Sequence, residues 1–180
     1  SPSVNTANEV FFMDRQSNIF ALDGTDPASW GTFGNLNGVL WSADASASTS
    51  QSSPALSPLG DVVYVGSDDD RVHAYTAPAV GTTGTKLWDT GTLSNNQDAD
   101  TKPVVDVAGN VYFVASSGGG STVNATSSAG GGLWSVPLGQ EAICNPTISS
   151  DGNTLYVGYD RGLKAYDTAN GNELWSYPPA

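Results

Sequence analysis

The sequence has few of the side chains on which most catalytic sites depend, since its 180 residues include one Cys and one His. The single Cys144 excludes an internal disulfide and a multi-cysteine zinc site. A Ser-His-Asp or Cys-His mechanism would depend entirely on His73. We expect His73 to be a structural or surface residue, and Cys144 to be a small, partly buried apolar group.

Positive charge is also scarce, because 18 acidic residues against 6 basic ones give a formal charge of −12. A field of this sign repels phosphates, and no run of Lys or Arg overcomes it locally. Nucleic acid and anionic membrane surfaces are therefore poor candidate partners. No apolar run approaches the roughly 18 residues of a membrane span, so we predict no membrane insertion. Gly and Pro are frequent and charged residues make up 13%, a composition that favours an extracellular, cell-surface or periplasmic all-β protein.

What the sequence does contain is one unit repeated four times. Each unit opens with a polar residue and Pro, has an aromatic residue at a nearly constant distance, and ends in Leu-Trp. The units run from Pro2 to Trp41, Pro54 to Trp88, Pro103 to Trp134 and Pro146 to Trp175. A period in the forties with four short strands per unit is typical of propeller blades.

The last unit shows the four expected strands, at residues 146–149, 154–158, 163–166 and 173–176, separated by turns rich in Gly, Asn and Asp. No segment of ten or more residues has helical periodicity, so we expect essentially no helix. We therefore predict one all-β domain over residues 1–180, a β-propeller of four four-stranded antiparallel blades at about 1–44, 53–92, 102–138 and 145–178.

The stretch Ala165-Tyr166-Asp167-Thr168-Ala169-Asn170-Gly171-Asn172-Glu173-Leu174-Trp175 resembles the tryptophan-docking motif of PQQ-like (pyrroloquinoline-quinone-type) β-propeller repeats. It has Ala first, Asp third, Gly seventh and Trp eleventh, while the other units have longer or shorter spacings. The resemblance implies that each motif Trp docks between its own blade and the next. The docking residues it assigns are Trp41, Trp88, Trp134, Trp175, Ala165 and Gly171.

The number of units differs from the usual count, because propellers of this family usually close with about eight blades. In a half-circle of four blades Trp175 would lack a following blade, and exposed apolar faces of this kind drive association. The alternatives are a compact four-blade closure, two chains completing one ring, a head-to-tail filament, or an excerpt of a longer protein. We expect a noncatalytic structural or protein-interaction module that binds itself through its terminal blades, as a homo-oligomer or polymer.

Two other functions stay open. The first is a fragment of a quinone-dependent dehydrogenase, whose relatives need a cofactor pocket, Ca²⁺, a catalytic Asp and, in many members, adjacent cysteines. One Cys and half the usual blades argue against it, so we predict no catalytic residue and no cofactor. The second is a glycan-binding propeller. The candidates for a partner or glycan surface are Trp30 and Phe33, aromatic residues in an insertion of the first unit. The alternative is that they cap the first blade's open edge.

Three further features are weak candidates. Asp68, Asp69 and Asp70 could hold Ca²⁺, although their position is the ordinary hairpin turn of the repeat. Asp98 and Asp100 are expected to be solubilising loop residues. Asn124-Ala125-Thr126 is a glycosylation sequon beside a Gly-rich loop, where it would be accessible in a secreted protein.

Overall fold

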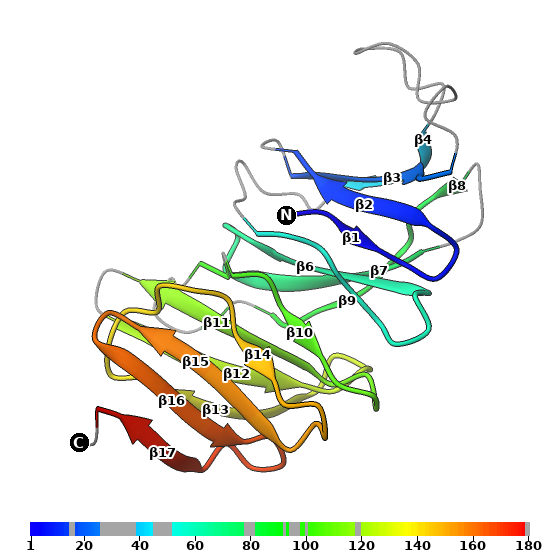
Figure 1. Cartoon of the computed structure of the whole chain (residues 1–180). Coiled ribbons are helices and arrows are strands. Elements are labelled where there is room, and N and C mark those ends of the chain that lie inside the picture. The colour runs from blue at the N-terminus through cyan, green and yellow to red at the C-terminus, as the bar shows by residue number, and fades with distance from the viewer. Residues whose placement is uncertain are drawn as a thin grey trace.

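A computed structural model describes the chain except for residues 15–16, 26–38, 45–51, 78–81, 92, 94–97, 100, 118–119 and 179–180, and gives only the backbone of 40, 41, 44, 82 and 83. The described residues form antiparallel sheets that follow one another as blades (Figure 1). They contain no helix, as the sequence predicts. Accordingly, this part of the chain has no helix that could cross a membrane.

The four blades are built from consecutive strands. The first contains β1 (Ser3–Val4), β2 (Glu9–Met13), β3 (Asn18–Asp23) and β4 (Val39–Asp44). The second contains β5 (Ala55–Leu56), β6 (Val62–Ser67), β7 (Arg71–Thr76) and β9 (Lys86–Asp89). The third contains β10 (Val104–Val105), β11 (Val111–Ser117), β12 (Gly120–Thr126) and β13 (Gly132–Pro137). The fourth contains β14 (Thr147–Ile148), β15 (Thr154–Tyr159), β16 (Gly162–Asp167) and β17 (Glu173–Tyr177).

The first sheet differs from the prediction because it has a fifth strand. β8 (Thr82–Thr83) lies between β7 and β9 in the sequence, but it pairs in parallel with β4 of the first blade. The backbone of Gly84 extends this contact by donating to the carbonyl of Ser42 at 2.9 Å. The extra residues of the second unit therefore cover an outer edge that would otherwise have unpaired backbone groups.

Local turn chemistry explains why each unit folds in the same way. The turn between the first two strands of each blade ends in a residue with positive φ, namely Asn8, Gly60, Gly109 and Gly152. Such a backbone conformation favours Gly and tolerates Asn. In the third blade the carboxylate of Asp106 accepts hydrogen bonds from the backbone of Ala108 and Asn110, which fixes the turn.

One row of residues recurs in the register of all four sheets, and in the second and third blades its Trp contacts the next blade. The row has one residue from each strand of the blade: a residue of the first strand, an aromatic residue of the second, Ala of the third and Trp of the fourth. The pairing register shifts directly after each Ala. The rows are Ser3-Phe11-Ala21-Trp41, Ala55-Tyr64-Ala74-Trp88, Val104-Tyr112-Ala125-Trp134 and Thr147-Tyr156-Ala165-Trp175. The Ala residues are at most 3% exposed, and Trp88 and Trp134 pack in the same hydrophobic clusters as the Ala of their own rows.

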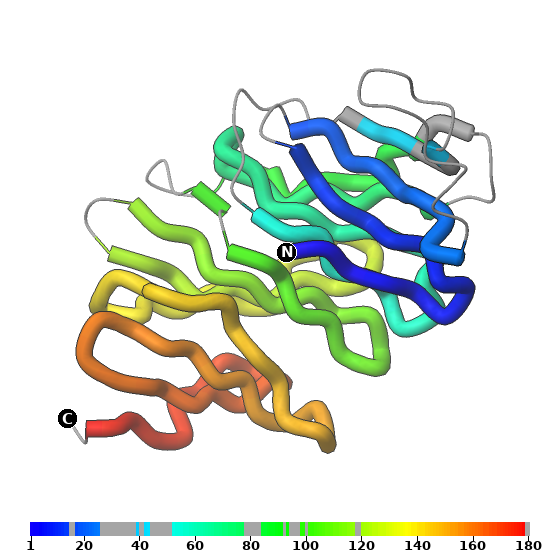
Figure 2. Tube along the Cα trace, turned by 45° about the horizontal axis from the view of Figure 1, so that its top comes forward, coloured from blue at the N-terminus to red at the C-terminus, as the bar shows by residue number. Residues whose placement is uncertain are grey.

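The hydrophobic core lies between adjacent blades. Its largest part joins Val114, Val123 and Leu138 of the third unit to Leu155 and Val157 of the fourth. The blades follow one another in an arc, with the first and last at opposite ends (Figures 1 and 2). The arc is open, so the compact closure of four blades, one of the alternatives above, is not the arrangement of this chain.

Candidate interaction surface

Trp88 shows how one blade docks on the next. Its indole Nε1 donates to the backbone carbonyl of Ser128, in the turn between β12 and β13, at 2.8 Å. Its ring lies against Gly130, where an added Cβ would come within 2.8 Å of Cγ and Cδ2. Gly130 also has a φ of +85°. The contact therefore requires a residue with no side chain and a left-handed backbone.

Trp134 makes the same contact one blade further on. Its Nε1 donates to the carbonyl of Thr168 at 2.8 Å, and its ring lies against Gly171, where a Cβ would be 2.7 Å from Cε3. The φ of Gly171 is +75°. Each Trp is also backed by the aromatic residue of its own blade, with ring centroids 5.7 Å apart for Tyr64 and Trp88. Two separate blade pairs thus share one docking geometry.

Trp175 occupies the equivalent position of blade 4, and none of the described sheets packs against its outer side. It keeps the contact with Tyr156, at 5.9 Å between ring centroids. Its side chain is nevertheless 46% exposed, and the described residues offer its Nε1 no acceptor. The Trp that completes a contact in the two preceding blades is here left half uncovered.

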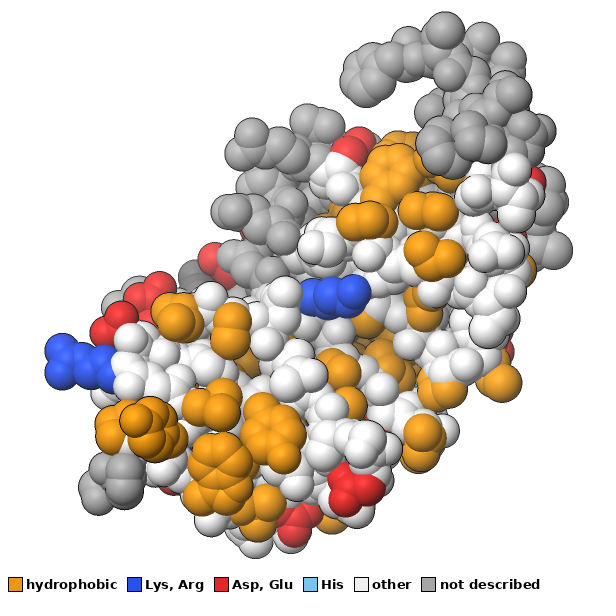
Figure 3. Space-filling view, viewed as in Figure 1, with side chains coloured by type: hydrophobic (Ala, Val, Ile, Leu, Met, Phe, Trp, Pro, Cys, Tyr) orange, Lys and Arg blue, Asp and Glu red, His pale blue; other side chains and the backbone are white. Residues whose placement is uncertain are grey.

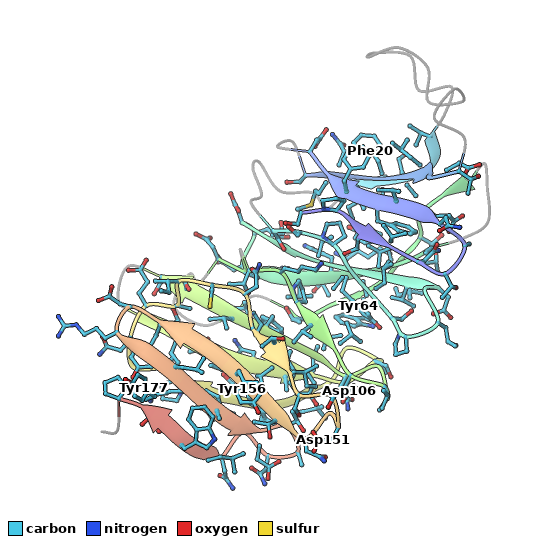
Figure 4. All side chains as sticks on the ribbon, in the orientation of Figure 1. Phe20, Tyr64, Asp106, Asp151, Tyr156 and Tyr177 are labelled. Carbon is cyan, nitrogen blue, oxygen red and sulfur yellow. The ribbon has the colours of Figure 1, made fainter. Side chains whose placement is uncertain are left out.

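The neighbours of Trp175 are uncovered in the same way. The register of the sheets equates Leu163 with Val123 and Tyr177 with Val136. Leu163 is 36% exposed where Val123 is fully buried, and Tyr177 is 69% exposed. We call Tyr156, Leu163, Trp175 and Tyr177 the open face of blade 4. Hydrophobic side chains gather over this end of the molecule, where Tyr156 and Tyr177 lie on β15 and β17 (Figures 3 and 4).

The first blade has an apolar face at the other end of the arc. Val10 pairs with Leu22, and Phe12 with Phe20, across β2 and β3. The two Phe rings stack with centroids 5.3 Å apart, and all four side chains are half-buried. Phe20 marks this face in Figure 4. We call these four residues the open face of blade 1. Val10 and Phe12 correspond to Leu155 and Val157 of blade 4, which are fully buried because they pack against blade 3.

The three adjacent aspartates lie in the turn between β6 and β7, where Asp70 has a positive φ of 65°. Both carboxylate oxygens of Asp69 lie 3.0 Å from Nε2 of His73, which is 1% exposed. Burial lowers the pKa of His73, while burial and the charges of Asp68 and Asp70 raise the pKa of Asp98. Among the described residues, no three His, Cys, Asp or Glu side chains are grouped to hold a metal ion.

Two expectations about exposure are wrong. Asn124 is 8% exposed, because it lies inside β12 between the buried Val123 and Ala125. Its amide nitrogen donates to Thr122, and its amide oxygen accepts from Ser135. The sequon is therefore not accessible in the fold. Cys144, expected to be partly buried, is exposed, because it lies in the connection that crosses over Gly158 rather than in a strand.

Other predicted residues lie outside the described part. Trp30 and Phe33 are among the residues not described, as is Asp100, and only the backbone of Trp41 is given. Gly130 is a docking residue that the sequence motif of the last unit does not cover. Gly130 precedes Trp134 by the same interval as Gly171 precedes Trp175, and this spacing alone could have identified Gly130 as a docking residue.

A family model described as outer membrane protein assembly factor BamB matches residues 68–179, more than half of the sequence. The chain belongs to this PQQ-repeat family. The structure is similar to the crystal structure of BamB from Moraxella catarrhalis, with a TM-score of 0.71 and 17% sequence identity. The alignment covers 96% of this chain and 46% of that protein, so the chain spans about half its length. No curated protein matches the sequence. The PQQ-like propeller fold expected from the repeats is thereby confirmed.

Proposed function

We propose that this chain is a noncatalytic protein-interaction propeller that works outside the cytoplasm and associates head-to-tail with a second copy of itself. The observation that carries the proposal is the open face of blade 4. It repeats, position by position, a face that blade 3 packs against its neighbour, with Tyr112 and Val123 buried and Trp134 and Val136 partly buried. BamB, by its description, is an assembly factor of the outer membrane, which supports an interaction role and an extracytoplasmic site.

The contact is proposed as head-to-tail because the two ends of the arc have different faces. In the interior, a face with the Trp row always packs against the opposite face of the next blade, as Trp134 does against Gly171. The open face of blade 4 is of the first kind and that of blade 1 is of the second. A contact between unlike faces is heterologous, so it either closes into a ring or continues as a filament.

Burial of the exposed side chains supplies the driving force. Fully burying a large apolar side chain contributes about 1.5–3 kcal/mol. Leu163, Trp175 and Tyr177 are each at least about one-third exposed, and the two Phe rings of blade 1 would meet them. A partner blade would also supply a carbonyl acceptor for Trp175, as Thr168 does for Trp134.

The test is a complementation experiment by sedimentation velocity. Leu163→Asp places a charge on the open face of blade 4, and Phe20→Asp does so on that of blade 1. Each variant alone should be monomeric, but their mixture should form a heterodimer, because each partner keeps one intact face. Leu59→Asp is the matched control, since Leu59 is 81% exposed at a turn of blade 2; this variant should behave as wild type.

Other outcomes overturn parts of the proposal. If the wild-type chain is monomeric, or if Leu59→Asp weakens association as much as the two face variants do, the proposed self-association is refuted. Loss with Leu163→Asp alone would show like faces pairing instead. Oxidation of alcohols or sugars after addition of the quinone and Ca²⁺ would refute the noncatalytic role. Fractionation of the source cells with an antibody tests the location, and recovery in the cytosol would contradict it.

A further inference from the structure

Lys102 is unusual in the charge pattern of the molecule. Among the Lys and Arg side chains that the structure describes, the other four each lie within salt-bridge distance of a carboxylate, as in Lys164 with Glu173 and Arg71 with Asp89. Lys102 has no such partner in the described part. In a chain with a charge of −12, a cation that lacks a carboxylate is a candidate for binding one from outside.

Lys102 is held in place by neighbours from two other blades. Its Nζ donates to Oγ of Ser3 at 2.9 Å, and that hydroxyl donates to the carbonyl of Pro54 at 2.6 Å. Its backbone nitrogen donates to the side chain of Asn145 at 2.8 Å. An ammonium group has three protons to donate, and the described residues accept only one of them. The group is therefore positioned before any ligand arrives.

Beside Lys102 lies a groove of about 370 Å³, formed by the inner strands β1, β5 and β10. Its apolar walls include Val4, Leu56, Val104 and Val105, and Lys102 and Ser3 add the polar groups. This volume is within the range of clefts that hold ligands, and such clefts combine apolar walls with a few fixed polar groups. The groove shares no residue with either open face.

The strands around the groove also offer backbone groups. Each of β1, β5 and β10 is the first strand of its sheet and has no sheet partner on the inner side. Edge strands of this kind present unpaired N–H and C=O groups. An extended peptide can pair with such an edge, and pockets along it then bind alternate side chains.

We propose that this groove binds an extended peptide that has one acidic side chain between apolar residues. The carboxylate lies on Nζ of Lys102, the apolar side chains lie against Val104 and Leu56, and the backbone pairs with an inner edge. The negative field of the whole chain does not prevent this, because at physiological ionic strength it is screened beyond about 8 Å. The proposal does not depend on self-association.

The experiment uses two peptides, N-acetyl-Leu-Asp-Leu-amide and its Asn counterpart, titrated into the wild-type chain by calorimetry. Backbone amide shifts of Val104 and Val105 locate the site by NMR. A hydrogen bond to a charged group corresponds to about a ten- to hundredfold difference in affinity. We expect the Asp peptide to bind that much more tightly, with shifts centred on β10.

Lys102→Met should abolish the difference between the two peptides. Lys164→Met makes the same change in charge at an ion-paired lysine, and it should leave the difference intact. Equal binding of the two peptides by wild type would overturn the proposal without any variant. Amide shifts confined to another part of the chain would also overturn it. The same holds if Lys164→Met reduces the affinity difference between the peptides as much as Lys102→Met does. Competition by free acetate as effective as the peptide would show an anion site instead of a peptide groove.

Discussion

Substitution of two glycines in the last blade separates the docking contact from the conformational demand of a turn. Gly152 and Gly171 have nearly the same φ, +76° and +75°. A Cβ on Gly152 would meet nothing within 4 Å, whereas on Gly171 it would come within 2.7 Å of the Trp134 ring. Gly152→Ala therefore introduces backbone strain alone, and Gly171→Ala introduces the same strain plus a collision with the indole.

The expected magnitudes follow from these two terms. A left-handed Ala costs about 1–2 kcal/mol, partly offset by the smaller entropy of the unfolded chain, about 0.4–1 kcal/mol. Gly152→Ala should therefore destabilise the fold by about 1 kcal/mol. Overpacking adds about 1–3 kcal/mol, so Gly171→Ala should cost about 2–4 kcal/mol. At roughly 2–4 °C per kcal/mol for a chain of this size, the two variants should differ clearly in Tm.

The assay is urea and thermal unfolding, followed by tryptophan fluorescence and near-ultraviolet circular dichroism. Trp134 should become more exposed to quenchers in Gly171→Ala, while Gly152→Ala should leave the native spectrum unchanged. Equal loss of stability in the two variants would refute the idea that Gly171 is required by the tryptophan contact. It would mean that its turn conformation alone explains the motif.

Three more predictions follow from individual contacts. Lys86 lowers the pKa of Asp89 to about 2, so the ionised carboxylate stabilises the fold at pH values above the usual pKa of Asp. Asp89→Asn should therefore cost about 1–2 kcal/mol at neutral pH. The difference in unfolding free energy between wild type and variant should vanish toward pH 2. Burial lowers the pKa of His73, so wild type should lose stability as pH falls below about 6.5, and His73→Gln should flatten that region of the profile. Trp134→Phe should cost about 1–2 kcal/mol through its lost hydrogen bond, measured by urea unfolding, while Trp175→Phe should change the stability of the monomer little; equal losses would contradict this.

The blade count, the strands and the family could be predicted because each depends on local patterns. The turn Asp167 to Gly171 brings β16 and β17 together through bonds within the turn itself, such as Gly171 to Asp167 at 2.8 Å. The same spacing of Gly, Leu and Trp predicts the row that faces the next blade. Neither inference needs knowledge of distant contacts, so the repeats in the sequence are sufficient.

The wrong or missing predictions depend on contacts between distant segments. β8 is two residues long and pairs with a strand of another blade, which no local pattern indicates. Asn124 lies on a strand buried on both faces, and its burial follows from the packing of Phe113 and blade 2 rather than from the Gly-rich loop beside it. Lys102 begins a repeat, but its lack of a carboxylate is visible only once the positions of the acidic residues are known.

The repeats also provide an internal standard for the open face of blade 4. Val123 and Leu163 occupy the same position of successive blades, and both are apolar although only the first is covered. A position that is permanently in water has no physical reason to keep Leu, Trp and Tyr in one row, since polar residues there would lower the risk of aggregation. Phe12 and Phe20 are equally apolar at the other end of the arc. Both faces therefore have the composition of covered surfaces, and this inference depends on their side chains alone.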